Sequence, residues 1–333
     1  MKNEELKYKN KMLRGMIYRR LWLLTFFILH SSFFILALYG CSGEQSSELS
    51  SCQDKRARDD QGRTSACWIY AMLECIEHEA AMRGDSVQLS RQWLMAKELE
   101  EQTVWHYLSD GKGADISLRG VGPEVLRLIQ IYGLVPYQHE KTQITRGSVT
   151  ERKLQLLARQ ALSLDDLRER MTDMLPQFTT TRPTTGKQPA FYYLSMRYNP
   201  LQFAESVMYY QHWHFYTSVP HHPYNTDITL EVADNRYHHA YTNLPIDSIT
   251  AKVLASLKAG HAVYWEYGNP TPDGIVSSDH AMAIEGIVKS HKHPGRIMLR
   301  CKNSYGKEWG QKGYCLISLP YFKAHTCNVG LVE

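Results

Sequence analysis

The first half of the chain places apolar residues with the period of an α-helix. Between Ala66 and Met82, apolar side chains recur every three or four residues, which predicts a helix with one face on a core. A second helix is predicted through RQWLMAKELEE, with Ser90 as its N-cap. A third is predicted through GPEVLRLIQIY, because Pro123 suits the first turn and Gly133 suits the position just beyond the end.

The second half has a different pattern, rich in aromatic and β-branched residues. ITLEVADN and HAVYWEYG are candidate strands, and HAMAIEGIVKS, RIMLRCKNS and GYCLISL predict three consecutive strands of one antiparallel sheet. The segment between the two halves is charged and helix-prone and ends in a Thr/Pro-rich stretch. A helical half followed by a mostly β half predicts the α+β class, with a cleft between the halves.

A long apolar run near the N-terminus stands apart from this globular pattern. Residues from Leu21 to Tyr39 are almost all apolar, with basic residues before them and the polar SGEQSSELSS after them. Such a run predicts an export signal or a membrane anchor. LYGC resembles the bacterial lipoprotein box, which implies lipid attachment at Cys41; an uncleaved N-terminal anchor is the alternative.

The chain is therefore expected to have three parts. Residues 1–41 form the signal, lipoprotein-type or anchor segment, residues 42–57 a flexible polar spacer, and residues 58–333 one folded domain. We expect that domain to be exported and to be tethered to a membrane through its N-terminus, at the bacterial surface or in the periplasm.

Composition narrows the possible partners. The 333 residues are 22% charged and 43% hydrophobic, as in an ordinary globular protein. The net charge of +4 is small, so we expect no nucleic-acid partner. The seven cysteines show no zinc-ribbon spacing, and we expect no metal and no cofactor. Disulfide pairing and oligomeric state stay open at this point.

Cys67 is the candidate nucleophile because it lies where the first predicted helix begins. Unpaired backbone N–H groups and the positive end of the helix dipole favour a thiolate there. A histidine elsewhere in the chain should act as base, and His280 is the candidate because it starts an apolar strand. Asn303, in the next strand, could accept the imidazole Nδ1 proton and so fix the ring.

Three segments in this order, QGRTSACW, DHAMAIEG and NSYGKEWGQKGY, resemble the papain superfamily of cysteine peptidases. The resemblance implies a papain-like α+β fold with the nucleophile helix in a helical left half, an antiparallel sheet in the right half, and the active-site cleft between them. It implies that Cys67 attacks a peptide carbonyl to give a thioester, with His280 as general base and then acid, and Asn303 as orienting residue. Gln61 would donate an N–H to the oxyanion.

Other matches to this family are weaker. RGVGPEVL resembles the glycine-pair segment that pairs with the substrate backbone, so Gly120 is a candidate substrate-binding residue, although Val121 interrupts the pair. Trp309 is a second candidate, for which packing beside the site is the favoured role. Thr64 stands where secreted members have a disulfide cysteine, and Tyr305 stands where most members have the tryptophan that shields the His–Asn hydrogen bond.

The spacing of the motifs indicates a particular branch. Cys67 and His280 are 213 residues apart, more than the roughly 130–150 of papain-like enzymes, which predicts an insertion at about 138–245. NPLQF and LPYFKAHTCNVGLVE resemble the bleomycin hydrolase and bacterial aminopeptidase C branch. Those relatives continue into an arm that binds a substrate's amino group, whereas this sequence stops at Glu333, so an endopeptidase is favoured over an aminopeptidase.

Two other functions remain open on the sequence alone. One is a catalytically silent papain-like module that binds peptides or proteins at the cell surface. The other is a Cys-His acyl transferase of the transglutaminase kind, which Asn303 in place of an aspartate argues against. The histidine pairs of the middle segment lack carboxylates or cysteines at metal-binding spacing. We therefore expect a peptide or protein substrate.

Overall fold

The computed structural model describes residues 60–333 except 112–113, 179–188, 271–277 and 290–295. The predicted N-terminal segment, the spacer and Cys41 lie outside the described residues. All described residues belong to one compact unit, which spans Ser46–Glu333. Within the described ranges, every helix is too short or too polar to cross a membrane.

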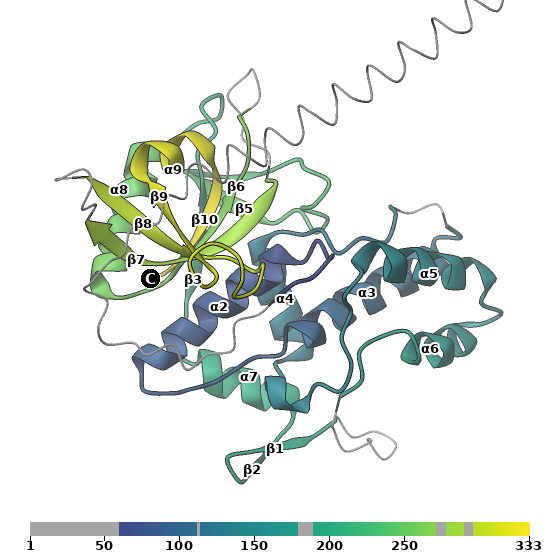
Figure 1. Cartoon of the computed structure of the whole chain (residues 1–333). Helices are drawn as coiled ribbons and strands as arrows, with labels where there is room; N and C mark the ends of the chain where they lie inside the picture. The colour runs from purple at the N-terminus through teal and green to yellow at the C-terminus, as the bar shows by residue number, and fades with distance from the viewer. Residues whose placement is uncertain (1–59, 112–113, 179–188, 271–277, 290–295) are drawn as a thin grey trace, which may run out of the picture. The chain divides into compact units, whose positions relative to one another are not determined.

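One lobe of the fold is helical (Figure 1). Its central helix, α2, contacts α3, α4 and α7, and α5 and α6 pack against α3. The bounds are α2 (Cys67–Met82), α3 (Arg91–Leu108), α4 (Gly122–Tyr132), the short 3-10 helix η1 (Tyr137–His139), α5 (Gly147–Gln160), α6 (Leu164–Thr172) and α7 (Pro200–Met208).

The three helices expected from the sequence are confirmed, with their caps. The Ser90 side chain accepts a hydrogen bond from the backbone N–H of Trp93 at 3.0 Å and so begins α3. Pro123 lies in the first turn of α4, and Gly133 ends that helix with a φ of 70°. A Cβ at Gly133 would lie 2.1 Å from the carbonyl carbon of Pro200, so the close approach of α7 also requires glycine here.

The other lobe is built on an eight-stranded sheet with the strand order β4-β5-β3-β10-β6-β7-β8-β9. Neighbouring strands are antiparallel except the parallel pair β3 and β5. The strands are β3 (Trp213–Thr217), β4 (Thr226–Thr229), β5 (Ala240–Asn243), β6 (Val263–Tyr267), β7 (His280–Lys289), β8 (Ile297–Lys302), β9 (Tyr314–Ser318) and β10 (Thr326–Val332). The three consecutive antiparallel strands predicted near the C-terminus are therefore confirmed as β7, β8 and β9.

Three further elements complete the described structure. α8 (Ile246–Ala259) and α9 (Leu319–His325) pack on the sheet. A separate hairpin is formed by β1 (Phe191–Tyr193) and β2 (Met196–Tyr198), next to α7 in Figure 1. The segment expected to be an insertion, residues 138–245, holds α5, α6, α7 and β1 to β5.

Only the beginning of ITLEVADN is a strand, so that prediction is wrong in part. β4 ends at Thr229. Asn235 stops the strand, because its Nδ2 donates to the carbonyl oxygen of Leu230 at 3.1 Å and its Oδ1 accepts from the backbone N–H of His239 at 2.9 Å. Residues 230–239 therefore form a compact loop, which we call the β4–β5 loop.

The two lobes share an apolar core. One buried cluster combines α2 with the sheet and includes Trp68, Ile69, Tyr264 and Ala281. A second cluster lies between the sheet and helices α8 and α9. Because α2 packs directly on β6 and β7, the first residue of the helix and the first residues of β7 are fixed relative to each other.

Candidate active site

The sequence-predicted residues meet in one pocket. Cys67 is the first residue of α2, and the pocket beside it has a volume of about 210 Å³. Gln61, Gly120, His280 and Cys67 all line it. These residues come from the loop before α2, the segment before α4 and the start of β7, so the pocket lies where the two lobes meet.

Asn303 orients the His280 ring from behind the pocket. The Nε2 atom of His280 lies 2.8 Å from Oδ1 of Asn303, and that oxygen also accepts the backbone N–H of Ser304 at 2.7 Å. Because the oxygen can only accept, Nε2 carries the proton. The expectation that Nδ1 would bond Asn303 is wrong. Because Asn303 meets the Nε2 end of the ring, Nδ1 is left as the basic nitrogen.

Aromatic rings pack against the His280 imidazole. Tyr305 stacks on His280 with ring centroids 4.8 Å apart, and its hydroxyl lies 3.5 Å from Nδ1. Tyr267 meets the same imidazole edge-on at 5.8 Å. Trp309 packs on Tyr305 at 6.0 Å and against the apolar cluster under α8 and α9, so it supports the site as a packing residue. Tyr305 thus lies where a shielding ring was expected.

Gln61 is held in a defined orientation. Its Nε2 donates to the carbonyl oxygen of Thr64 at 2.7 Å, and its Oε1 accepts the hydroxyl of Ser304 at 2.5 Å. The Thr64 carbonyl can only accept, so this network fixes which end of the amide is the NH2 group. One N–H of that group remains for a ligand in the pocket. Sequence reasoning gave Ser304 no role, although it lies next to Asn303 in the motif.

Burial favours the neutral forms of the thiol and the imidazole. It raises the pKa of Cys67 to about 11, although backbone N–H groups of Ala281 and Trp68 act in the other direction. It also lowers the pKa of His280, which the bond to Asn303 opposes. The expected thiolate at the helix start is therefore not the favoured resting form, because removing water from the sulfur outweighs the helix end.

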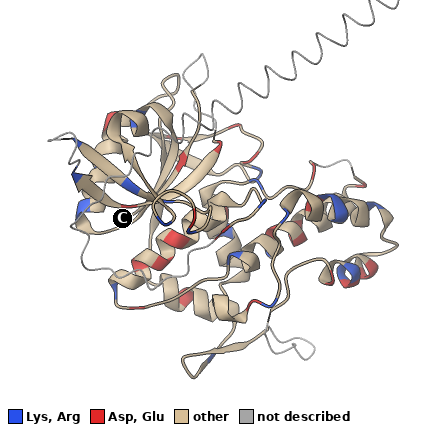
Figure 2. Ribbon diagram, viewed as in Figure 1, with Lys and Arg blue, Asp and Glu red and all other residues tan. Residues whose placement is uncertain are grey.

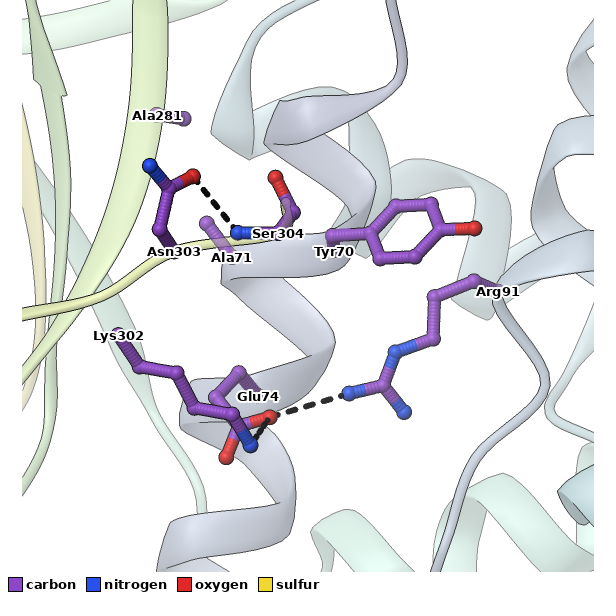
Figure 3. Close-up of a pocket in the computed structure, with 8 residues that line it drawn as sticks. All are labelled: Tyr70, Ala71, Glu74, Arg91, Ala281, Lys302, Asn303 and Ser304. Atoms are coloured by element: carbon purple, nitrogen blue, oxygen red, sulfur yellow. Dashed lines mark hydrogen bonds and ion pairs between the residues drawn. The ribbon is translucent and has the colours of Figure 1, made fainter. Parts of the chain in front are cut away.

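A network of buried charges lies directly beneath Asn303 (Figure 3). Lys302 binds Glu74 through Nζ at 2.6 Å, and Arg91 reaches the same carboxylate at 3.3 Å. Arg91 also pairs with Glu77 at 3.0 Å. All four side chains are almost completely buried. Acidic residues colour parts of α2 red in Figure 2, and in the sequence these residues were visible only as three glutamates, Glu74, Glu77 and Glu79, in a largely apolar helix.

A second ion pair closes one end of the pocket. The Arg119 guanidinium makes a two-pronged contact with Asp234 of the β4–β5 loop, at 3.0 and 2.8 Å. Its Nη2 also lies 3.3 Å from the carbonyl oxygen of Ser278 in the sheet lobe. All three residues line the pocket. The sequence carried no signal for this contact, because Arg119 and Asp234 are 115 positions apart and Asp234 lay in a predicted strand.

One group of described side chains has the spacing of metal ligands. Carboxylate oxygens of Glu98, Glu101 and Glu124 lie within 4.8 Å of one another. Other side chains already bind these carboxylates: Arg127 contacts Glu101 and Glu124, Arg236 contacts Glu98, and His239 contacts Glu124. The group therefore works as an ion-pair network that ties α3 and α4 to the β4–β5 loop.

Comparison with known proteins gives a likeness in structure only. The sequence matches no family profile and no curated protein. PepW from Lactobacillus rhamnosis HN001 superposes with a TM-score of 0.59 and 18% identity, covering 86% of this chain and 82% of PepW. SERA5E from Plasmodium falciparum gives a TM-score of 0.43 and 14% identity, covering 87% of this chain and 93% of SERA5E, which adds nothing to the assignment. The chain has the papain-like α+β fold.

Proposed function

We propose that the protein is a cysteine peptidase that hydrolyses peptide bonds through a thioester intermediate. The observation that carries the proposal is the hydrogen bond from Nε2 of His280 to Asn303, which leaves Nδ1 as a base in the pocket that Cys67 lines. Gln61, oriented by Thr64 and Ser304, supplies a donor to the same pocket. A nucleophile, a base, an orienting residue and an oxyanion donor are the groups that acyl transfer requires.

Because the Cys67 thiol and the His280 imidazole are both neutral at rest, the first step must include transfer of the thiol proton. His280 takes the Cys67 proton on Nδ1 as the sulfur attacks the peptide carbonyl carbon. The oxyanion would accept hydrogen bonds from Gln61 Nε2 and the backbone N–H of Cys67, each contributing about 3–4 kcal/mol. Collapse breaks the C–N bond, the amine takes the proton from His280, and the acyl group stays on sulfur as a thioester. Water, deprotonated by His280, then attacks the thioester, the C–S bond breaks and the thiol is restored.

We also propose that the protein cleaves internal bonds and that it is related to the bleomycin hydrolase and aminopeptidase C branch. The motif spacing and the segments NPLQF and LPYFKAHTCNVGLVE support the relation to that branch, and the cleavage mode is decided by experiment. Peptides with an acetylated amino end separate the two modes, since an aminopeptidase needs a free α-amino group and an endopeptidase does not.

A catalytically silent binding module is the second candidate. The observation in its favour is the raised pKa of Cys67, about 11, which burial produces and which makes a spontaneous thiolate rare at neutral pH. Such a module would keep the pocket and bind peptides without turnover.

We also propose that the protein is exported and is tethered to a membrane by its N-terminal segment. The support is the apolar run from Leu21 to Tyr39 and the LYGC sequence around Cys41. Metabolic labelling with palmitate, followed by fractionation, would show lipid on the wild-type protein and none on Cys41→Ser. A labelled Cys41→Ser protein, or a wild-type protein without lipid, would contradict lipid attachment at Cys41.

Turnover is tested with the full-length protein and Cys67→Ala, both purified in non-ionic detergent because of the apolar run. Each is offered a mixed peptide library in two forms, with free and with acetylated amino ends, and the cuts are read by mass spectrometry. Internal cuts in acetylated peptides that disappear in Cys67→Ala support the peptidase and the endopeptidase mode. An intact library with a folded, reduced protein, or unchanged cutting by Cys67→Ala, contradicts the proposal for this site.

The protonation state of Cys67 gives an independent test. We expect the rate at which iodoacetamide alkylates Cys67 to rise steadily from pH 6 to pH 10, because burial raises the thiol pKa to about 11. The modified peptide is quantified by mass spectrometry, and Cys75, which is fully buried, serves as the control site. A rate that is already at its plateau near pH 6 would show a preformed thiolate–imidazolium pair instead.

A further inference from the structure

The β4–β5 loop is fastened firmly to the helical lobe. Arg236 is its main anchor, with Nη1 at 3.0 Å from Oε1 of Glu98 and at 3.0 Å from the carbonyl oxygen of Arg119. Two more side chains tie the same loop to α3 and α4, namely Tyr237 to Glu101 at 2.9 Å and His239 to Glu124 at 2.8 Å. Charge-assisted bonds of this kind are short and directional, so the loop is held in one position.

This position places a wall across one end of the pocket. Asp234 projects from the loop to Arg119, and Arg119 continues to the carbonyl oxygen of Ser278 in the other lobe. Gly120 adjoins this wall, and a Cβ there would lie 2.6 Å from the Trp68 ring, so its backbone lies against α2. With about 210 Å³, the pocket is smaller than the roughly 300–1,000 Å³ of drug-sized ligand sites and fits about one substrate residue beside the scissile bond.

The charge of this wall is negative. Asp234 is balanced by Arg119, and that hydrogen-bonded contact raises the pKa of the guanidinium, to which the nearby charge of Asp279 adds. Asp279 lines the same pocket, is exposed, and has no ion-pair partner anywhere in the described part of the chain. Two carboxylates and one guanidinium leave one negative charge beside the reacting bond. A carbonyl oxygen, that of Ser278, adds a hydrogen-bond acceptor.

We propose that Arg119, Asp234 and Asp279 form a subsite for a positively charged nitrogen of the substrate, held about one residue from the scissile bond. The inference rests on the proposed function of the pocket and names the substrate class. An α-ammonium group at a free amino end and the side chain of a lysine or arginine present the same chemistry. Both donate hydrogen bonds to carboxylate and carbonyl oxygens and gain from the local negative charge.

The test measures binding and turnover separately, with three peptides of otherwise identical sequence. One has a free amino end and neutral side chains, one is acetylated with lysine next to the scissile bond, and one is acetylated with norleucine in that place. Binding to full-length Cys67→Ala is measured by fluorescence anisotropy, and cleavage by the full-length wild type by mass spectrometry. We expect at least one cationic peptide to bind about tenfold more tightly than the norleucine peptide, and less so in 0.5 M salt.

The variants assign the preference to the wall. Asp279→Asn should reduce the tenfold preference to about twofold or less, and Asp279→Glu should keep most of it. Asp247→Asn is the matched control, since this exposed carboxylate pairs with Lys323 far along the chain and should leave the preference intact. Equal binding of all three peptides, an unchanged preference in Asp279→Asn, or no binding at all overturns the subsite.

The two proposals fail in different ways. Cleavage of all three peptides without a charge preference overturns the subsite and leaves the peptidase standing. Charge-selective binding without cleavage overturns the peptidase and leaves the subsite standing. If only the free amino end is preferred, the ammonium is the source; if only lysine is preferred, the side chain is the source.

Discussion

Two groups of charged residues adjoin the candidate active site, and burial separates them. Beneath Asn303, the side chains of Lys302 and Glu74 are 6% and 4% exposed. At the pocket end, the side chains of Arg119 and Asp234 are 50% and 19% exposed. The contact geometry is similar, with N–O distances of 2.6 and 2.8 Å.

This difference in exposure assigns different tasks to the two groups. A buried pair becomes costly when one partner is lost, because the other charge then stays in a low-dielectric interior without compensation. A pair open to water contributes little to folding, because solvent replaces what either partner loses. The group under Asn303 therefore fixes the position of the orienting residue, and the group at the pocket end is available to meet a ligand.

Removing one buried charge should have the largest effect on stability. We expect Lys302→Met to lower the free energy of unfolding by about 3–5 kcal/mol, because it leaves the Glu74–Glu77–Arg91 group with an excess negative charge. Urea unfolding of the full-length protein, followed by tryptophan fluorescence, measures the change. Lys323→Met, which breaks an exposed pair with Asp247, is the control. A loss below about 1 kcal/mol for Lys302→Met would erase the contrast between the two groups.

Glu98 sharpens the comparison, because it is fully buried yet anchors the β4–β5 loop. Burial, and then the charge of Glu124, raise its pKa from 4.5 to about 7. An acid whose pKa is raised in the folded state binds its proton more tightly there. The contribution of Glu98 to the free energy of unfolding is therefore greatest below about pH 4.5 and is lost as the pH rises through about 7. Between pH 5 and pH 8, the free energy of unfolding of the wild type should therefore fall by about 1–3 kcal/mol more than that of Glu98→Gln.

Denaturant unfolding at several pH values measures this difference. Glu100→Gln, two residues further along α3 with a side chain that is 38% exposed, should keep the wild-type pH dependence. Identical pH dependence in wild type and Glu98→Gln would show that Glu98 is ionised in the folded protein throughout this range.

The pocket-end pair should give the smallest effect on stability. Arg119→Ala is expected to change the free energy of unfolding by no more than about 1 kcal/mol, because the Arg119 side chain is 50% exposed to water. The same urea titration measures it, at low and at high salt. A loss above about 2 kcal/mol would mean that the wall is a structural support of the fold.

Much of the fold follows from local patterns. Helix caps at Ser90 and Gly133 and the strand patterns of the C-terminal third act over a few residues, and each was confirmed. ITLEVADN misled because its alternation favours a strand, whereas the Asn235 side chain bonds the backbone and turns the chain.

The candidate site was predictable to the extent that its residues lie in motifs. Gln61, Cys67 and His280 line one pocket, and Asn303 holds the imidazole. The imidazole nitrogen that meets Asn303 depends on the orientation of the His280 side chain, and the protonation of Cys67 depends on burial, so neither could be read from spacing. The contact of Arg119 with Asp234 depends on the position of the β4–β5 loop in the folded chain, which no local sequence pattern predicts.

The order of strands in the sheet has a consequence for synthesis. β10, the last strand of the chain, lies between β3 and β6 and pairs with both. While residues 326–332 are still inside the ribosome, β3 and β6 lack the neighbour that joins them, and the sheet cannot close. The sheet is thus expected to close only after residues 326–332 have left the ribosome, and until then the edges of β3 and β6 are open to chaperones.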